Sequence, residues 1–143
     1  MTIPVLSLLG FALWTLLILF VTVGPYRWSR VLTGRASLSQ WSADPGTSTG
    51  WYARAMRAHM NCIENLPVFG AIVFAVQQAH LSSPLVDGLA LSVLGARVLQ
   101  TTVHISLEQT DLVVGFRFSF FLVQLMAMLA MVVALLALAF PAP

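Results

Sequence analysis

Four long apolar segments constrain this chain more than any other feature of its sequence. They run from about residue 3 to 24, 51 to 80, 85 to 106 and 112 to 140. A helix needs about 20 apolar residues to cross a bilayer. Because backbone groups in lipid must be hydrogen-bonded internally, each segment is predicted to be a helix. We therefore expect an all-α membrane protein, with residues 1–143 forming one domain that is an up-and-down bundle of four transmembrane helices.

The composition supports this class and excludes several others. Hydrophobic residues make up 59% of the chain and charged residues 8%, whereas a soluble domain carries about 25% charged residues. A net charge of +2, divided among apolar runs, does not favour nucleic-acid binding. Cys62 is the single cysteine, so no intrachain disulfide can form. His59, His80 and His104 lack companions at ligand spacing, so no metal site is expected.

Proline-containing motifs separate or end the apolar segments. These motifs are Gly24-Pro25, Asp44-Pro45-Gly46, Ser82-Ser83-Pro84 and Pro141-Ala142-Pro143. The first is predicted to interrupt the first helix, and the second is a turn signal in the polar stretch that follows. No basic residue precedes the first segment and no small-residue cleavage site follows it, so we expect a retained helix and not a signal peptide.

The basic residues are all arginine and predict how the chain is oriented. Five lie in or beside the first connection, one borders the third, and the second connection holds only Asp87: the six arginines are Arg27, Arg30, Arg35, Arg54, Arg57 and Arg117. The positive-inside rule then places the first and third connections in the cytoplasm and both termini outside. Arginine-only basicity and an alanine-rich last helix are typical of a GC-rich bacterial genome. This predicts a bacterial inner-membrane protein.

A polar stripe begins the second helix. At 100° per residue, Arg57, Asn61 and Glu64 share one face with Arg54 and Asn65. Arg54 by itself is interpreted as an interfacial anchor. Glu64 lies deep in a spanning helix, where an unpaired carboxylate costs a few kcal/mol. Arg57 is about 10 Å from it along the helix axis, so another helix or a ligand must lie between them.

The third and fourth helices carry further polar residues. Arg97, Gln100, Thr101 and His104 share one face of the third helix, and Arg97 is too deep for an interfacial anchor. His104 has two open interpretations, as a buried hydrogen-bonding residue or as a catalytic one. Arg117, read alone, is a topology determinant.

Together, these faces predict a polar site in the cytoplasmic half of the membrane. Charge inside a membrane is by default a sign of function. The balance of charge is positive, so the expected ligand is anionic, water-soluble and rich in hydrogen-bonding groups. Arginines would bind its carboxylates and Glu64 an ammonium.

The run Arg57-Ala58-His59-Met60-Asn61-Cys62-Ile63-Glu64-Asn65-Leu66-Pro67-Val68-Phe69 resembles the signature of a known family. This is the family of membrane-associated proteins in eicosanoid and glutathione metabolism (MAPEG), which includes microsomal glutathione transferases and leukotriene C4 synthase. Arg97 with a polar residue three positions later, and Arg117 at the start of the last helix, resemble its other landmarks. The four-helix layout is similar over essentially the whole chain.

The resemblance implies a homotrimer that binds glutathione, as co-substrate, between neighbouring subunits near the cytoplasmic surface. It implies glutathione-binding roles for Arg30 (or Arg27 in its place), Arg57, Asn61, Glu64, Arg97 and Gln100. It also implies that Arg117 stabilises the glutathione thiolate, and we hypothesise that His104 helps. The implied activity is that of a glutathione transferase or peroxidase, which serves detoxification. The thiolate would attack a lipophilic electrophile or a hydroperoxide that arrives through the membrane lipid.

The sequence departs from the family pattern in two places. The family often has tyrosine where His104 stands, and some members have another where Phe121 stands. The connection before Arg117 is also several residues longer than in the eukaryotic enzymes. These departures affect the chemistry more than the binding.

A second hypothesis treats the protein as a non-catalytic membrane oligomer. Its polar faces would then lock helices together through buried hydrogen bonds, or bind an anionic ligand without turnover. This hypothesis predicts that Glu64→Gln breaks the oligomer without any glutathione phenotype, whereas the enzyme hypothesis predicts weaker glutathione binding. A transporter is disfavoured, because the sequence has neither paired broken helices nor an inverted repeat.

Overall fold

The computed structural model describes residues 1–41 and 50–139, with side chains up to residue 137. The elements are α1 (Ile3–Ile18), η1 (Leu19–Val23), α2 (Gly24–Leu32), η2 (Leu38–Gln40), α3 (Trp51–Gln78), α4 (Pro84–Ser106) and α5 (Asp111–Ala139). The first three form one continuous helix. Within the described residues, four helices are thus long and apolar enough to cross a membrane. The prediction of an all-α membrane protein with four spanning helices is confirmed.

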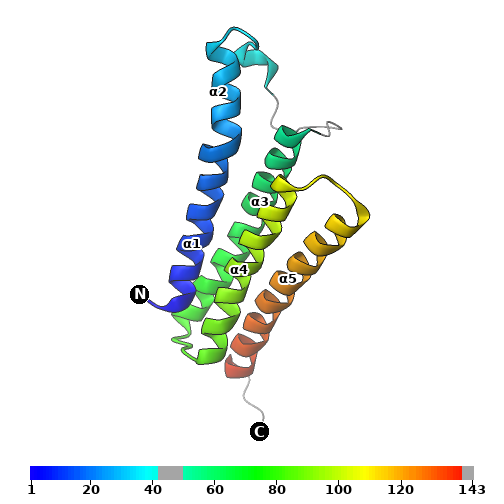
Figure 1. Cartoon of the computed structure of the whole chain (residues 1–143). Helices are drawn as coiled ribbons and strands as arrows, with labels where there is room; N and C mark the ends of the chain where they lie inside the picture. The colour runs from blue at the N-terminus through cyan, green and yellow to red at the C-terminus, as the bar shows by residue number, and fades with distance from the viewer. Residues whose placement is uncertain (42–49, 140–143) are drawn as a thin grey trace.

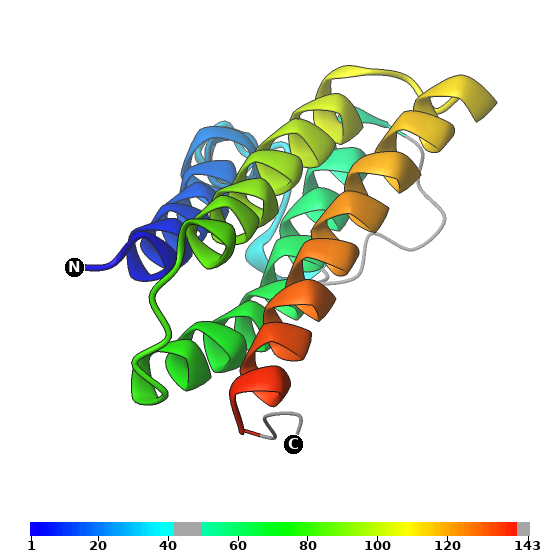
Figure 2. The same ribbon diagram turned by 90° about the horizontal axis from the view of Figure 1, so that it is seen from below.

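The four helices run alternately up and down, so the connections gather at two ends (Figure 1). The start of α1, the end of α5 and the α3–α4 connection lie at one end, which we call the apolar end. The end of α2, the start of α3 and the α4–α5 connection lie at the other end, which we call the arginine end because it holds Arg27, Arg54 and Arg57. Figure 2, seen from below, shows α4 between α1 and α5. α1 packs against α3 and α4, whereas α5 packs mainly against α4.

The predicted break of the first helix at Gly24-Pro25 is wrong, because the helix continues to Leu32. A π-helical turn, η1, precedes the proline, and in it the Gly24 amide donates to the Leu19 carbonyl. This wider turn makes room for a proline ring that would otherwise clash with the preceding carbonyls. A Cβ on Gly24 would lie 3.0 Å from the Leu19 oxygen, so glycine suits this position.

The other helices begin and end within two residues of their predicted limits. α3 continues through Pro67 and ends at Gln78 because His80 has a left-handed φ of 50°. The amide of Leu81 then donates to the Val76 carbonyl and that of His80 to Gln77, which is a Schellman motif. Ser83 caps α4 by accepting a hydrogen bond from the Val86 amide at 3.2 Å.

Two predicted features lie outside the described residues. They are the turn at Asp44-Pro45-Gly46 and the end of the last helix at Phe140, before Pro141-Ala142-Pro143.

The apolar core lies between the two ends and toward the apolar end. Phe11 and Phe69 are fully buried and in tilted contact, with ring centroids 6.1 Å apart. Valine, alanine and methionine side chains of α3, α4 and α5 complete this cluster. At the apolar end the Gln77 side chain donates to the Thr2 hydroxyl. The core fixes how α3, α4 and α5 approach one another, and thereby shapes the cleft at the other end.

Candidate functional site

A cleft of about 370 Å³ opens between α3, α4 and α5, on the arginine side of the core. Seven residues line it: Asn61, Glu64, Gln100, Val114, Arg117, Phe118 and Phe121. Four of these, one or two from each of the three helices, are residues that the sequence predicted to share a ligand. The structure therefore brings Asn61, Glu64, Gln100 and Arg117 together, as predicted.

Two polar atoms of this lining are buried without a hydrogen-bond partner in the described part of the chain. One is Nε of Arg117, a donor, and the other is Oε1 of Gln100, an acceptor. A buried polar group without a partner costs about 1–3 kcal/mol. The cleft therefore offers both a cationic donor and an acceptor to a polar ligand.

Glu64 is exposed on the surface of the single chain, although it lies in a membrane-spanning helix. An ionised carboxylate facing hydrocarbon is unfavourable by several kcal/mol. Its side chain interacts electrostatically with Arg97 on α4, which answers part of the pairing problem posed by the sequence. The rest of its surroundings must come from outside this chain, whether from a ligand or from another subunit.

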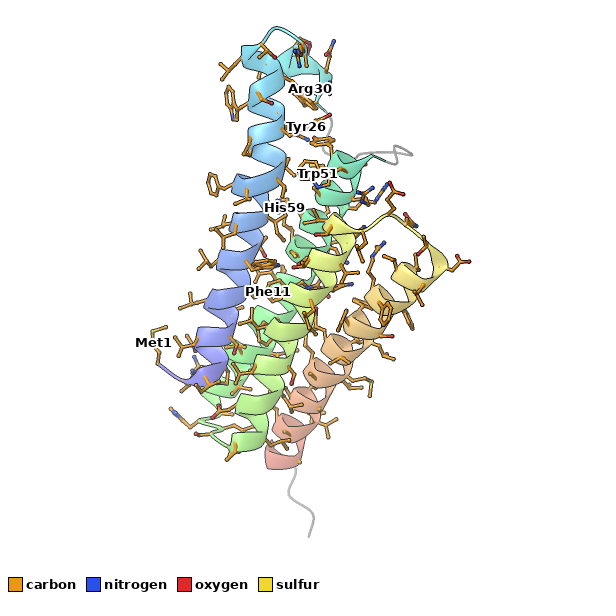
Figure 3. The ribbon with its side chains drawn as sticks, viewed as in Figure 1. Met1, Phe11, Tyr26, Arg30, Trp51 and His59 are labelled. Carbon is orange, nitrogen blue, oxygen red and sulfur yellow. The ribbon has the colours of Figure 1, made fainter. Side chains whose placement is uncertain are left out.

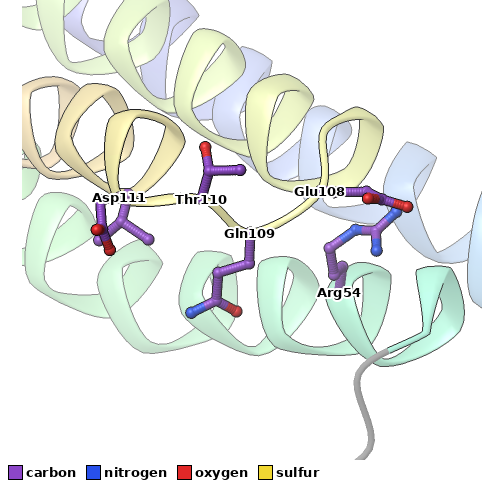
Figure 4. A pocket seen from close by; sticks show the side chains of 6 residues that line it. Arg54, Glu108, Gln109, Thr110 and Asp111 are labelled. Atoms are coloured by element: carbon purple, nitrogen blue, oxygen red, sulfur yellow. The ribbon is translucent and has the colours of Figure 1, made fainter.

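A second, larger pocket of about 560 Å³ lies at the mouth of the cleft. Figure 4 shows it from close by: Arg54 rises from α3, and the α4–α5 connection and the start of α5 supply Glu108, Gln109, Thr110 and Asp111. Val114 lines both this pocket and the cleft. The two hollows therefore adjoin, and the α4–α5 connection before Arg117 forms the polar rim of the site.

Arg57 and His104 border the cleft without lining it. His104 is buried and lies within electrostatic range of Arg54, Arg57 and Arg117, three cations. Arg57 also interacts electrostatically with Arg117. The arginine end of the bundle thus concentrates positive charge around the cleft, as the sequence predicted.

Arg97 lies elsewhere than the sequence suggested. It is fully buried, with its guanidinium 5.4 Å from the centroid of the Phe11 ring of α1 and beside the thiol of Cys62. None of its three side-chain nitrogens has a hydrogen-bond acceptor by geometric criteria in the described residues. Arg97 therefore faces α1 and α3, and it lies within electrostatic range of Glu64.

Arg30 and Arg27, the two candidates on the first helix, have different surroundings. Arg30 is exposed and stacks on Tyr26 at 4.9 Å, on the part of the helix that extends beyond the other three (Figure 3). Arg27 instead donates from Nε to the Tyr52 hydroxyl at 2.6 Å, and so links α2 to α3. Neither lines the cleft of its own chain.

The sequence analysis missed one polar residue, Gln124. It is fully buried on α5 and donates from Nε2 to Oδ1 of Asn65 at 3.2 Å. Gln124 lies seven residues after Arg117, or two helical turns, so both share a face. That spacing was the available signal, although a single glutamine in an apolar helix is weak by itself.

The described residues contain no group of three or more histidine, cysteine or acidic side chains that could hold a metal ion. The polar groups around the cleft are instead guanidinium, amide and carboxylate groups. They suit an organic ligand that carries charges of both signs.

These features define a class: an integral membrane protein with a polar cleft set into an apolar four-helix bundle. The family model of the MAPEG family matches residues 4–137, nearly the whole chain. The chain belongs to the MAPEG family, which confirms the resemblance seen in the sequence. Searches of curated proteins and of solved structures found no match. Membership indicates a glutathione-related or eicosanoid-related membrane protein, in a family that has both enzymes and non-enzymatic members.

Proposed function

We propose that this protein is a membrane enzyme that binds glutathione and stabilises its thiolate for attack on a lipophilic electrophile or a hydroperoxide. The observation that carries the proposal is the cleft itself. It holds a buried arginine donor without an acceptor, Arg117, beside Asn61, Gln100 and a carboxylate, Glu64. Such an arrangement complements a small anionic ligand that also carries a cation.

Glutathione matches the charges around this cleft. It has two carboxylates, one ammonium and a thiol, and is negative overall at neutral pH. Arg54, Arg57 and Arg117 concentrate positive charge at the arginine end, while Glu64 supplies a negative group on the cleft wall. In the proposed complex the arginines hold the carboxylates and the thiolate, and Glu64 holds the ammonium.

Arg117 would activate the thiol. A model thiol has a pKa of about 8.5, so only a few per cent is ionised at pH 7. A guanidinium held against the sulfur in a water-poor cleft favours the thiolate and lowers the pKa of the bound thiol. His104 would help through a hydrogen bond, in place of the family tyrosine.

The thiol proton passes to water, and the thiolate sulfur then forms a bond to the electrophilic atom. In conjugation the leaving group departs with the electron pair of the bond that breaks. With a hydroperoxide the O–O bond breaks, the distal oxygen stays on sulfur as a sulfenic acid, the other oxygen takes up a proton and leaves as an alcohol, and a second glutathione converts the sulfenic acid to a disulfide with loss of water.

The second substrate would come from the lipid. Phe118 and Phe121 line the cleft beside Arg117, and Phe118 is largely exposed on the face that a bilayer would cover. An apolar molecule dissolved in the membrane could therefore reach the sulfur from this side without crossing water. Conjugation and peroxide reduction share this first step.

We also propose that the site is completed by neighbouring copies in a homotrimer. Glu64 is exposed on a single chain at membrane depth, which favours a protein neighbour over hydrocarbon. Arg30, exposed on the helix extension, would reach the glutathione of an adjacent subunit. In this arrangement the arginine end faces the cytoplasm of a bacterium, both termini lie outside, and the protein resides in the inner membrane.

The test is Arg117→Leu, with turnover of a model electrophile and glutathione affinity measured on the same detergent-purified samples. We expect turnover to fall by about 100-fold or more, with glutathione binding largely retained. Arg35→Leu is the charge-matched control, since Arg35 is exposed in the first connection and away from the cleft. Unchanged turnover in Arg117→Leu would reduce this arginine to a topology determinant.

A second candidate function is that of a non-catalytic oligomer, and hydrogen bonds between the helices of one chain illustrate the kind of contact that it would use. Trp14 donates to the Thr101 hydroxyl at 2.7 Å across α1 and α4, and Gln124 to Asn65 at 3.2 Å across α5 and α3. Such bonds hold membrane helices together whether or not a ligand is present. This candidate predicts no thiolate and no turnover in the intact protein.

A further inference from the structure

Three amides form a hydrogen-bonded chain behind the cleft, which we call the amide relay: Gln124 on α5, and Asn65 and Asn61 on α3. Gln124 Nε2 donates to Asn65 Oδ1 at 3.2 Å. Asn65 Nδ2 donates to Asn61 Oδ1 at 3.0 Å and to the Asn61 backbone carbonyl at 2.8 Å. The relay therefore starts at a fully buried glutamine and ends at a residue that lines the cleft.

The direction of this relay is fixed by the backbone. An amide side chain can in principle be reversed, because its oxygen and nitrogen are similar in size. The Asn61 carbonyl, however, can only accept, so the nitrogen of Asn65 must point toward Asn61. The oxygen of Asn65 then points toward Gln124, which must donate, and the oxygen of Asn61 must accept.

The direction of the relay determines which kind of ligand atom Asn61 can bind. Oδ1 of Asn61 already accepts from Asn65, whereas the Nδ2 donor of Asn61 takes no part in the relay. We therefore infer that Nδ2 is the group that Asn61 offers to the cleft. The geometry points to Gln124 and Asn65 as positioning residues that hold Asn61 as a hydrogen-bond donor. The ligand atom beside Asn61 is then an acceptor, a carboxylate or peptide carbonyl oxygen, and the ligand's ammonium lies at Glu64.

The relay also ties the two walls of the cleft. α5 packs mainly against α4 and has little contact with α3. Gln124 and Arg117 share a face of α5, so the hydrogen bond from Gln124 to Asn65 sets the height of Arg117 relative to Asn61 and Glu64. Oε1 of Gln124 is buried without a partner in the described chain. An unpaired buried amide oxygen is energetically unfavourable, so the presence of Gln124 here is consistent with a positioning role.

This inference rests on the proposed function, because it assigns the polarity of the proposed glutathione site. The experiment measures the glutathione dissociation constant for the full-length protein and for Gln124→Met, Asn65→Leu and the double variant. Thermal midpoint and oligomeric state are measured on the same samples. Ser7→Ala is the control, since Ser7 is a buried polar residue on α1 whose hydroxyl also lacks a partner.

We expect each single variant to weaken glutathione binding about fivefold, the effect of one hydrogen bond. The double variant should be no weaker than Asn65→Leu alone, because both residues act through the same relay. Ser7→Ala should bind as the unmodified protein does. Additive losses would overturn the relay, as would unchanged affinity in both single variants.

The two proposals fail in different ways. If the unmodified protein binds no glutathione, the proposed function itself fails. If it binds and the relay variants bind equally well, only the relay is wrong. If Asn65→Leu does not fold, Gln124→Met decides, because it preserves the side-chain length and removes only the amide.

Discussion

The two ends of the bundle are built from the same four helices but by different physical rules. At the apolar end, α3, α4 and α5 meet through Phe69, Val93 and Met131, which are fully buried in an apolar cluster. At the arginine end the same helices hold guanidinium, amide and carboxylate groups around a cleft. Two of these groups, on Arg117 and Gln100, have a buried polar atom without a hydrogen-bond partner in the described residues. The apolar end is held mainly by apolar contacts within one chain, whereas the arginine end has unpaired polar groups around a cleft, which suit a ligand and a neighbour.

That contrast shows where function can be sought in a membrane bundle. Lipid tails are as apolar as leucine, so van der Waals packing is the main interaction that holds the apolar end together. Polar groups at the arginine end are energetically unfavourable in lipid, so their presence there indicates a function and not a contribution to packing. Variants at the two ends should therefore separate stability from glutathione binding.

The largest effect in this comparison, a loss of glutathione affinity, is expected from Glu64→Gln at the arginine end. Losing the charge removes the proposed partner of the glutathione ammonium, and hydrogen bonds to charged groups are worth about 1.5–3 kcal/mol. Glutathione should bind about 10-fold to 100-fold more weakly, while the oligomer persists. Calorimetric titration with size analysis of the detergent complex checks both. Dissociation of the oligomer with no glutathione phenotype would favour the non-catalytic candidate.

A smaller effect, at the opposite end, is expected from Phe69→Leu. The Phe11–Phe69 contact is an aromatic pair of the kind worth about 0.5–1.5 kcal/mol beyond its buried area. The variant should lower the free energy of unfolding by at least this amount, because leucine also buries less apolar area, and should leave glutathione affinity unchanged. A thermal melt and a binding isotherm on the same sample measure the two. A large loss of affinity would show that the two ends are coupled.

The smallest effect is expected from Thr101→Val, which removes the acceptor for Trp14 at 2.7 Å. Hydrogen bonds between membrane helices average about 0.6 kcal/mol, because the separated helices also find partners. The variant should therefore be only slightly less stable, as measured by reversible unfolding in mixed detergent. A loss of several kcal/mol would mean that this contact organises α1 against α4.

Much of the fold could be predicted from the sequence because the bilayer restricts the solutions. Apolar length alone located four helices to within two residues at most ends. The exception was Gly24-Pro25, where a proline usually ends a helix. Here a π-helical turn accommodates it, and a pattern of residue types does not reveal that backbone adjustment.

The cleft was predictable in part. Asn61 and Glu64 lie on one face of a helix by periodicity, and the structure places both in the cleft with Gln100 and Arg117. Arg97 shares a face with Gln100 in the same way, yet it faces Phe11. One face of α4 contacts both α1 and the cleft, so periodicity alone cannot tell which of the two a residue on that face will meet. Gln124 was missed because its role depends on a hydrogen bond to Asn65 on another helix, and helical periodicity does not reveal contacts between helices.

The central claim is that the arginine end stabilises a glutathione thiolate, and a pH titration of thiolate absorbance tests it most directly. Glutathione is added to the detergent-purified protein and, in parallel, to Arg117→Leu. The account predicts a thiolate signal at neutral pH for the unmodified protein that is lost in the variant. Glutathione binding without this signal would mean a pocket without the chemistry. Neither binding nor signal would contradict the account and leave a membrane oligomer held together by its polar residues.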